Sequence, residues 1–314
     1  MRVVVLAGGT GGAKLAAGLQ AVLPPGDLTV VVNTGDDTER HGLLVMPDHD
    51  ACLYMLAGRF DYERGWGVTG ETWTVMEALA EYGEEGWFRL GDHDFATHIA
   101  RHARLAGGSR LTTAVRGLQA STGIPSLILP MTDSPVRTEI RIDEGWLDFQ
   151  DYFVRRHHAD EALELRFSGA SDARPTSEVA HAIGTADLIV IAPSNPFVSI
   201  GPMLAVPGLL NLVLNASAPV VAVSPIVGGA AVRGPAADMM RSLGKQPGTA
   251  AGVAAYYHAT YRGLVDVLVI DNADAGESDA IARAGMRPLV TNTLIATPDA
   301  RRRLAEELLS TIAR

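Results

Sequence analysis

The first forty residues constrain this chain most, because a glycine-rich run directly follows an apolar segment. Residues 1–6 are mostly apolar and β-branched, as expected of a buried parallel strand, and residues 8–12 contain four glycines. Apolar residues then recur at helical spacing from Leu15. A strand, a glycine turn and a helix bring backbone N–H groups and the positive helix N-terminus toward an anion. The segment therefore predicts a phosphate-binding turn.

This glycine run fits neither common phosphate-binding pattern. A dinucleotide-binding fingerprint requires Gly-x-Gly-x-x-Gly or Ala, whereas the run that starts at Gly9 ends on Lys14. A Walker loop requires Gly-x-x-x-x-Gly-Lys-Ser/Thr, which is absent from these residues. Lys14, expected in the first helical turn, is unfavourable for the helix dipole and is better explained by a negative ligand. The alternative is a tight strand-to-helix turn that binds nothing.

Length and composition fit a soluble α/β protein and exclude several classes of protein. The 314 residues can bury a large core, with 47% hydrophobic and 20% charged residues. A net charge of −10 without a basic stretch argues against a general nucleic-acid binder, but not against a phosphorylated ligand. The single cysteine, Cys52, excludes an intrachain disulfide framework and a cysteine-rich zinc site. With no signal peptide or membrane-spanning run evident, we expect a cytoplasmic protein.

At least five apolar segments alternate with helical patterns, and most of them end in Gly, Asp, Asn or Ser. They lie at residues 1–6, 28–32, 126–130, 186–192, 219–223 and 265–270. This alternation predicts a Rossmann-like, doubly wound and mainly parallel sheet that collects ligand groups at its carboxyl edge. We predict one α/β domain, residues 1–314, with a core at about 1–47 and 121–314 and a mostly helical insertion at about 48–120. Residues 138–149 predict a small hairpin, and the charged segment after it a lid or a solvated edge.

Four carboxylates lie within fifteen positions after the second predicted strand. Asp36 and Asp37 follow its end, and Asp48 and Asp50 come shortly after, with Asp48 expected to cap a helix over residues 51–56. Adjacent acids at the carboxyl edge of a sheet suit a hard cation such as Mg²⁺. The alternative is that acidic helix caps and solvated turns explain them.

The predicted insertion holds two further groups of candidate residues. Residues 64–73 contain two tryptophans and three glycines, which suits a flat aromatic ligand, although tryptophans also cover cores. Asp94, His98 and His102 share one helix face, and Asp92 is expected to cap that helix. The general-base glutamate of a zinc helix and a third ligand are not evident, so we do not expect zinc.

Two later strand ends carry small polar residues on a rigid backbone. Residues 193–202 combine three prolines with Ser194, Asn195 and Ser199. Residues 224–229 follow a later strand in the same way, with Ser224 next to a proline. Proline presets the backbone, and loops at strand ends position ligand-binding groups. Both segments therefore predict ligand loops.

Together these motifs make the chain resemble the 2-phospho-L-lactate transferase family of coenzyme F-420 biosynthesis, including its actinobacterial phosphoenolpyruvate transferase members. The resemblance runs nearly end to end. It is carried by GGTGGAKL at 8–15, NTGDD at 33–37, PDHD at 47–50, RGWG at 64–67, LGDHDFATH at 90–98, LPMTDSPVRT at 129–138, FQDYFV at 149–154, APSNPFVSIGP at 192–202 and SPIVGG at 224–229. His49 departs from the commonest form of the third motif, Pro-Asp-Leu-Asp, but both aspartates are present.

The resemblance implies a Mg²⁺-dependent phosphotransferase. Its acceptor is the deazaflavin Fo, and its donor is a guanosine diphosphate ester of lactate, enolpyruvate or glycerate. The terminal ribityl hydroxyl of Fo attacks the distal phosphorus, and GMP leaves. The resemblance also implies a homodimer, without nucleic-acid or membrane partners. No residue distinguishes the three donors.

The resemblance and the residue patterns together assign roles to particular residues. The expected metal ligands are first Asp37 and Asp50, and second Asp36 and Asp48, serving the metal rather than the core. The expected donor- and phosphate-binding residues are Gly8, Gly9, Thr10, Gly11, Gly12, Lys14, Ser194, Asn195, Ser224, Gly228 and Gly229. The expected Fo-binding residues are Trp66, Asp92, Asp94 and Ser199. The expected catalytic residues are Asp37, Asp50 and His98, and the identity of any general base stays open.

Two other functions compete with this interpretation. A sister family of the gluconeogenesis-factor type resembles the glycine turn and the acidic strand end, and is associated with nucleotide-sugar binding and regulation. The segments at 90–98 and 193–202 and the tryptophans of 64–73 fit the transferase better. A nicotinamide oxidoreductase would use an acid such as Asp36 to bind ribose, but the fingerprint broken at Lys14 disfavours it.

Overall fold

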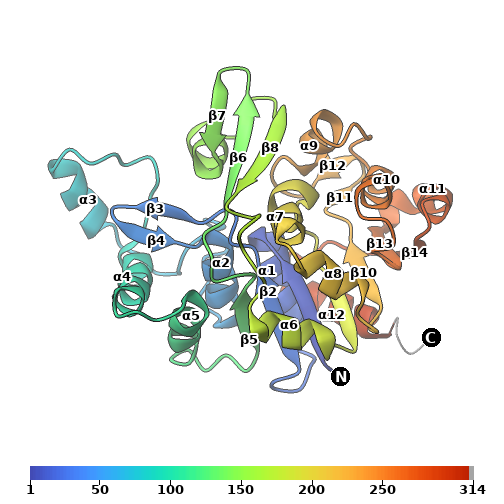
Figure 1. Cartoon of the computed structure of the whole chain (residues 1–314), viewed down its shortest axis with the longest axis horizontal. Helices are drawn as coiled ribbons and strands as arrows, with labels where there is room; N and C mark the ends of the chain where they lie inside the picture. The colour runs from blue at the N-terminus through green and yellow to red at the C-terminus, as the bar shows by residue number, and fades with distance from the viewer. Residues whose placement is uncertain (311–314) are drawn as a thin grey trace.

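The computed structural model of the protein describes residues 1–310, which form an α/β fold around one central sheet (Figure 1). In this part of the chain the sheet has seven strands, ordered β14–β13–β10–β9–β1–β2–β5, and every neighbouring pair is parallel. The strands are β1 (Val3–Ala7), β2 (Leu28–Val32), β5 (Leu127–Pro130), β9 (Leu188–Ile191), β10 (Val220–Val223), β13 (Val267–Asp271) and β14 (Arg287–Thr291). The predicted doubly wound parallel sheet is therefore confirmed.

The chain reverses its direction across the sheet beside β1. From β1 it proceeds to β2 and β5 on one side, and it then returns to β9 on the other side and continues outward. The loops after β1 and β9 consequently diverge and leave a crevice at the carboxyl edge, where open α/β sheets bind ligands. Residues 8–12 and 193–202, both singled out from the sequence, begin at this crevice.

Helices cover both faces of the sheet, and alternate residues of β1 point into two separate apolar cores. Val4 and Leu6 belong to the larger core, and Val3 and Val5 to the core shared with α1, α2 and α12. The period of two in a buried strand produces this division. The covering helices are α1 (Gly9–Gln20), α2 (Pro47–Leu56), α6 (Ser177–Gly184), α7 (Gly201–Ala205), α8 (Leu209–Leu214), α9 (Ala236–Ser242), α10 (Ala250–Thr260), α11 (Ser278–Arg283) and α12 (Pro298–Ser310).

The segment between β2 and β5 is mostly helical. A hairpin at the start of the segment, formed by β3 (Thr38–Arg40) and β4 (Leu43–Val45), was not predicted. The later helices are α3 (Thr74–Glu81), α4 (Asp92–Ala106) and α5 (Leu111–Gln119). α2 packs on α1 and contributes Cys52 and Leu53 to the core, and α5 packs against the edge strand β5, so that α3 and α4 stand away from the sheet (Figure 1, left).

A small antiparallel sheet projects from the carboxyl edge (Figure 1, top). Its strands are β6 (Arg137–Ile142), β7 (Gly145–Asp148) and β8 (Glu164–Ser168), with β6 in the middle. The predicted hairpin is confirmed as β6–β7. The charged segment after it contributes a short π-helix, η1 (Asp151–Arg155), and the third strand.

Two helix starts differ from the predictions. α1 begins at Gly9, so the later glycines form its first turn and Lys14 lies in its second turn rather than its first. α2 begins at Pro47 after Met46, so Asp48 lies inside the helix and is not its N-cap. Proline is favoured at the first helical position, which Pro47 takes in α2, and the Gly9 amide at the start of α1 donates to Asp48.

The end of the chain shows two further differences. Strand β14 was not predicted, because its sequence contains Arg287 and Pro288 and only one of its edges is paired, with β13. The apolar periodicity of residues 298–313 predicts an amphipathic C-terminal helix, which is confirmed through Ser310, and its expected continuation to residue 313 lies outside the described residues. No helix within residues 1–310 combines the length and the apolar character needed to cross a membrane.

Gly18→Ala should destabilise the protein although alanine favours helices by about 1 kcal/mol. A Cβ at Gly18 would lie 2.4 Å from the carbonyl oxygen of Arg301 on α12, so the two helices would have to separate. We expect the free energy of unfolding, measured with urea, to fall by about 1–3 kcal/mol. The control is Gly184→Ala at the end of α6, where a Cβ would meet nothing within 4 Å and stability should not fall. Equal stabilities for both variants would contradict this packing.

Candidate active site

A cavity of about 620 Å³ lies at the carboxyl edge of the sheet. Its wall joins segments that are far apart in the sequence, including the ends of β1, β2 and β9 and the N-terminus of α2. The expected site residues in this wall are Gly8, Gly9, Thr10, Gly11, Lys14, Asp36, Asp48, Asp50, Trp66, Asp94, His98, Ser194, Asn195, Ser199 and Ser224. Most of the residues singled out from the sequence therefore meet in one place.

The glycine turn is held against the loop after β9 by close contacts. The Gly8 amide donates to Ser194 Oγ at 3.1 Å, and this hydroxyl donates to the Gly8 carbonyl oxygen at 2.7 Å. A Cβ at Gly11 would lie 2.7 Å from the carbonyl oxygen of Pro193, so a larger residue does not fit. The N-terminus of α1, whose first N–H groups have no acceptor within the helix, thus lies in the cavity wall.

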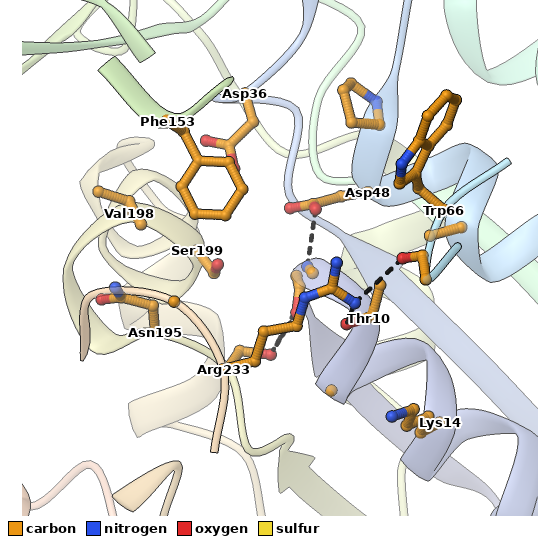
Figure 2. A pocket seen from close by; sticks show the side chains of 18 of the residues that line it. Thr10, Lys14, Asp36, Asp48, Trp66, Phe153, Asn195, Val198, Ser199 and Arg233 are labelled. Carbon is orange, nitrogen blue, oxygen red and sulfur yellow. Dashed lines mark hydrogen bonds between the residues drawn. The ribbon is translucent and has the colours of Figure 1, made fainter. Parts of the chain in front are cut away.

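Two carboxylates from different elements project toward the same part of the cavity (Figure 2). Asp48 accepts hydrogen bonds from the Gly9 amide at 2.7 Å and from Asn33 Nδ2 at 3.0 Å. Asp36 is buried, and its Oδ1 has no hydrogen-bond partner among the described residues. Burial raises the pKa of Asp48 to about 6, and burial together with the Asp48 charge raises the pKa of Asp36 well above its usual value. Two buried, mutually repelling carboxylates with a free oxygen suit a divalent cation.

Asp50 lies in the same wall but already has a cationic partner. The guanidinium of the fully buried Arg101, on α4, is bonded to the Asp50 carboxylate and also donates to the Leu44 carbonyl oxygen at 3.0 Å. Burial alone would raise the pKa of Asp50, but Arg101, His49 and His98 hold it well below its usual range. This geometry does not favour the expectation that Asp50 serves a metal rather than the core, because its charge neutralises a buried arginine.

Asp37 is buried and does not line the cavity. Burial raises its pKa well above the usual value, although the charges of Arg137 and Arg101 partly oppose this. Of the four acids predicted to bind metal, the second-choice pair, Asp36 and Asp48, is therefore the pair that faces the cavity without a cationic partner.

Asp94 and His98 on α4 form a buried titratable group with Asp50. The Tyr54 hydroxyl donates to Asp94 Oδ1 at 2.6 Å, and His98 Nε2 lies 3.4 Å from the same oxygen. Burial and the Asp50 charge raise the pKa of Asp94 to about 7, and burial lowers the pKa of His98 to about 4. Ligand atoms of the three residues lie within 4.8 Å of one another, but the adjacent Arg101 guanidinium disfavours a metal ion. The arrangement suits proton transfer better.

Aromatic side chains flank the cavity on opposite sides (Figure 2). On one side, Trp66 packs edge-on against Trp73 with ring centroids 5.9 Å apart. On the other side, Phe153 of η1 is stacked on Phe149 with centroids 5.5 Å apart. Two more aromatic residues line the cavity, Trp87 and Phe88. A flat aromatic ligand can be bound between such walls.

Five expected site residues do not line the cavity: Gly12, Asp37, Asp92, Gly228 and Gly229. Asp92 caps a different helix, because its carboxylate accepts the backbone N–H groups of Thr74 and Val75 at 3.1 and 3.0 Å at the start of α3. The Gly228 amide donates to Asp274 at 3.0 Å in the turn between β11 (Ile226–Val227) and β12 (Ala230–Ala231). The structure thus does not bring Asp92 or this turn to the candidate site.

The sequence analysis missed several residues of the site. Phe153 lies in a segment that was singled out, at 149–154, but was given no role. Tyr54 carried no signal, because its partner Asp94 lies 40 positions away in the sequence. Arg101 was expected beside His98 at a substrate-facing edge of its helix, but its pairing with Asp50, 51 positions away, was not predicted. Arg233 lies in an irregular loop after β12 whose residues match no motif beyond the adjacent glycine and proline.

Similarity to known proteins extends over nearly the whole chain. The family model described as 2-phospho-L-lactate transferase CofD matches residues 3–308. A phosphoenolpyruvate transferase from Streptomyces griseus is 43% identical, with 98% of this chain and 98% of that protein aligned. A 2-phospho-L-lactate transferase from Methanosarcina acetivorans is 39% identical, with 96% of each aligned.

Solved structures with low sequence identity to this chain share the fold. A crystal structure of a UPF0052 family protein from Bacillus halodurans superimposes with a TM-score of 0.64, over 98% of each chain, at 16% identity. At that identity the likeness concerns the fold alone.

Asp50→Asn and Asp36→Asn should change stability in different directions. Asp50→Asn leaves the buried charge of Arg101 without its partner, so the free energy of unfolding should fall by about 3–5 kcal/mol. Asp36→Asn removes a buried charge that repels Asp48, so stability should be unchanged or higher. Urea unfolding at pH 7 without divalent cations measures both. Equal losses would contradict the assignment of Asp50 to a structural ion pair.

The raised pKa of Asp94 should make stability depend on pH. Its pKa is about 7 in the folded protein and about 4 when unfolded, so between these values the folded state binds more protons. The free energy of unfolding should therefore fall as pH rises from about 4 to about 7, by at most about 1.4 kcal/mol per pH unit for this group.

Asp94→Asn should reduce this slope without abolishing it, because Asp48 titrates in the same range. Urea unfolding at pH 5, 6 and 7 measures the slope, and Asp238→Asn, at an exposed position, is the control. A slope unchanged in Asp94→Asn would contradict the raised pKa of this group.

Proposed function

Because the chain belongs to the 2-phospho-L-lactate transferase family CofD, we propose that it transfers a phospho-three-carbon-acid group from a guanosine diphosphate ester to the deazaflavin Fo. The group is phospholactyl, phosphoenolpyruvyl or phosphoglyceryl, and GMP is released. One observation carries the proposal: a helix N-terminus, an acid pair without a cation and facing aromatic walls share one cavity. They match a diphosphate, Mg²⁺ and a flat acceptor, respectively.

The donor's diphosphate is assigned to the N-terminus of α1. Glycine allows phosphate oxygens to approach the backbone closely, and the helix dipole favours their charge. Lys14, half-buried in the second turn, adds a positive charge, and Ser194 and Ser224 line the same cavity. This placement puts the distal phosphorus near the acid pair, since Asp48 is bonded to the Gly9 amide.

Asp36 and Asp48 fit the Mg²⁺ that the family implies. The fit rests on the unpartnered Asp36 Oδ1 and on the raised pKa values of both acids, which indicate a site short of positive charge. When bound, Mg²⁺ supplies charge neutralisation for the diphosphate and the leaving GMP. Asn33 holds Asp48 in position through its amide.

The acceptor ring is assigned to the space between Trp66 and Phe153, which leaves its ribityl chain free to reach the donor. The terminal hydroxyl oxygen forms a bond to the distal phosphorus, and the bond from that phosphorus to the bridging oxygen breaks. GMP keeps the bridging oxygen and its electron pair. The hydroxyl proton passes to Asp94, whose raised pKa near neutrality suits a general base, with His98 beside it.

A nucleotide-sugar-binding regulator of the gluconeogenesis-factor type is the alternative. It would need the glycine turn and the acids, but neither the paired aromatic walls nor Asp94. We also propose, from the family resemblance alone, that the protein is a cytoplasmic homodimer.

Purified protein with Fo, Mg²⁺ and each of the three donors should release GMP together with a phosphodiester of Fo, detected by mass spectrometry. Asp36→Asn should lower turnover roughly a hundredfold or more, since charge stabilisation dominates phosphoryl transfer. Asp92→Asn, outside the cavity, is the control and should stay near wild-type turnover. Absence of GMP release with all three donors, alongside tight binding of a nucleotide sugar, would favour the regulator instead.

A further inference from the structure

Three cations surround the glycine turn without forming ion pairs with acids among the described residues: Lys14, Arg233 and Arg301. Their proximity shows in the pKa of Lys14, which is lowered by burial and by the charges of Arg301 and Arg233. In a chain with 36 acidic and 26 basic residues, such a group of uncompensated cations is informative. It indicates that this side of the cavity receives an anion.

The three cations differ in how firmly they are held. Arg301 is buried, and its guanidinium donates to the Ile295 and Ala296 carbonyl oxygens and to the Tyr62 hydroxyl. These hydrogen bonds hold the Arg301 guanidinium in place, so it is not available to bind a ligand directly. Arg233 is exposed, on the loop between β12 and α9, and is free to change its partners.

Arg233 bridges two walls of the cavity (Figure 2). Its Nη1 donates to the Gly65 carbonyl oxygen at 3.0 Å and lies 3.4 Å from Thr10 Oγ1. Thr10 belongs to the glycine turn, and Gly65 adjoins Trp66. Both acceptors are neutral, so the guanidinium charge is not compensated by either contact. One side chain thus touches both the expected donor wall and the expected acceptor wall.

Gly65 is shaped for this contact. Its φ is +78°, and a Cβ there would lie 2.8 Å from Arg233 Nη1 and 3.1 Å from Nη2. The guanidinium therefore lies directly against the glycine backbone, and a side chain at position 65 would push it away. Glycine is therefore required at position 65 for two reasons, the positive φ and the space taken by the Arg233 guanidinium.

We propose that Arg233 binds the diphosphate of the donor opposite the glycine turn and, through Gly65, couples donor binding to the position of Trp66. This inference rests on the proposed function and deepens it. A guanidinium presents paired N–H groups that match phosphate oxygens, which a lysine such as Lys14 does not. The contact of Arg233 with the Gly65 carbonyl oxygen orients the adjacent Trp66, against which the acceptor ring binds. Binding of the donor would therefore also order the acceptor site.

The first experiment measures GDP binding and the steady-state kinetics of Arg233→Ala. We expect the dissociation constant of GDP and the KM of the donor to rise about ten- to a hundredfold, as for the loss of a charge-assisted hydrogen bond. The melting temperature should not change, because the side chain is exposed. Arg241→Ala is the matched control, because Arg241 is exposed on α9, pairs with Asp238 and does not line the cavity.

Rescue separates this role from a structural one. Added guanidinium at millimolar concentration should restore part of the donor affinity of Arg233→Ala, and Arg233→Lys should recover only part of it. GDP affinity and kinetics in Arg233→Ala equal to wild type would overturn the inference. A fall in melting temperature that accounts for the loss, with no rescue by guanidinium, would overturn it as well.

The coupling to Trp66 is tested by a double-mutant cycle. Gly65→Ala should weaken GDP and raise the KM of Fo in the wild-type background, and should have much less effect on GDP in the Arg233→Ala background. Additive effects would overturn the coupling. If the wild-type protein binds GDP through Arg233 but releases no GMP from any donor, the proposed function fails while the assignment of Arg233 stands.

Discussion

The hydrogen bond from the Gly9 amide to Asp48 Oδ1 joins the parts of the site, because it ties the N-terminus of α1 to α2. Asn33 extends the connection to the end of β2 through the second oxygen of the same carboxylate. The contact depends on a very close approach, since a Cβ at Gly8 would lie 2.5 Å from Ser199 Cβ and 2.9 Å from Asp48 Oδ2. Glycine at this position therefore lets the N-terminus of α1 and the Asp48 carboxylate share one cavity wall.

The electrostatics of the site depend on which charges are compensated. Arg101 neutralises Asp50 inside the protein, so this pair holds α4 against α2 and the β3–β4 hairpin. Within residues 1–310, no basic side chain pairs with Asp36 or Asp48, and no acid pairs with Arg233 across the cavity. Uncompensated negative and positive groups thus face one space. Under the proposed function, a diphosphate bound with a divalent cation would compensate the buried acids and the exposed arginine alike.

The sequence predicted the sheet and the edge at which the candidate site lies, but not which of the four acids face the cavity without a cationic partner. Strand ends converge at the carboxyl edge of any parallel sheet, so the motifs after β1, β2 and β9 had to meet. Asp36 and Asp37 are adjacent in one turn, and no local pattern tells which of them faces the ligand. Asp92 resembled a cap of its own helix, yet it caps α3, because the chain before α4 folds back on it.

The parallel sheet and the chemistry available at its carboxyl edge could be predicted from the residue pattern, because periodicity and glycine placement act locally, whereas the reversal of the chain beside β1 came from the structure. Only the tertiary structure decided which charges are paired, because the partners lie far apart along the chain. Arg101 is 51 positions from Asp50, and Arg233 is 168 positions from Gly65. Whether a buried carboxylate pairs with an arginine or lacks a cationic partner depends on residues that are distant in the sequence. The free-energy cost of burying its charge is offset only by the groups that lie beside it in the folded protein.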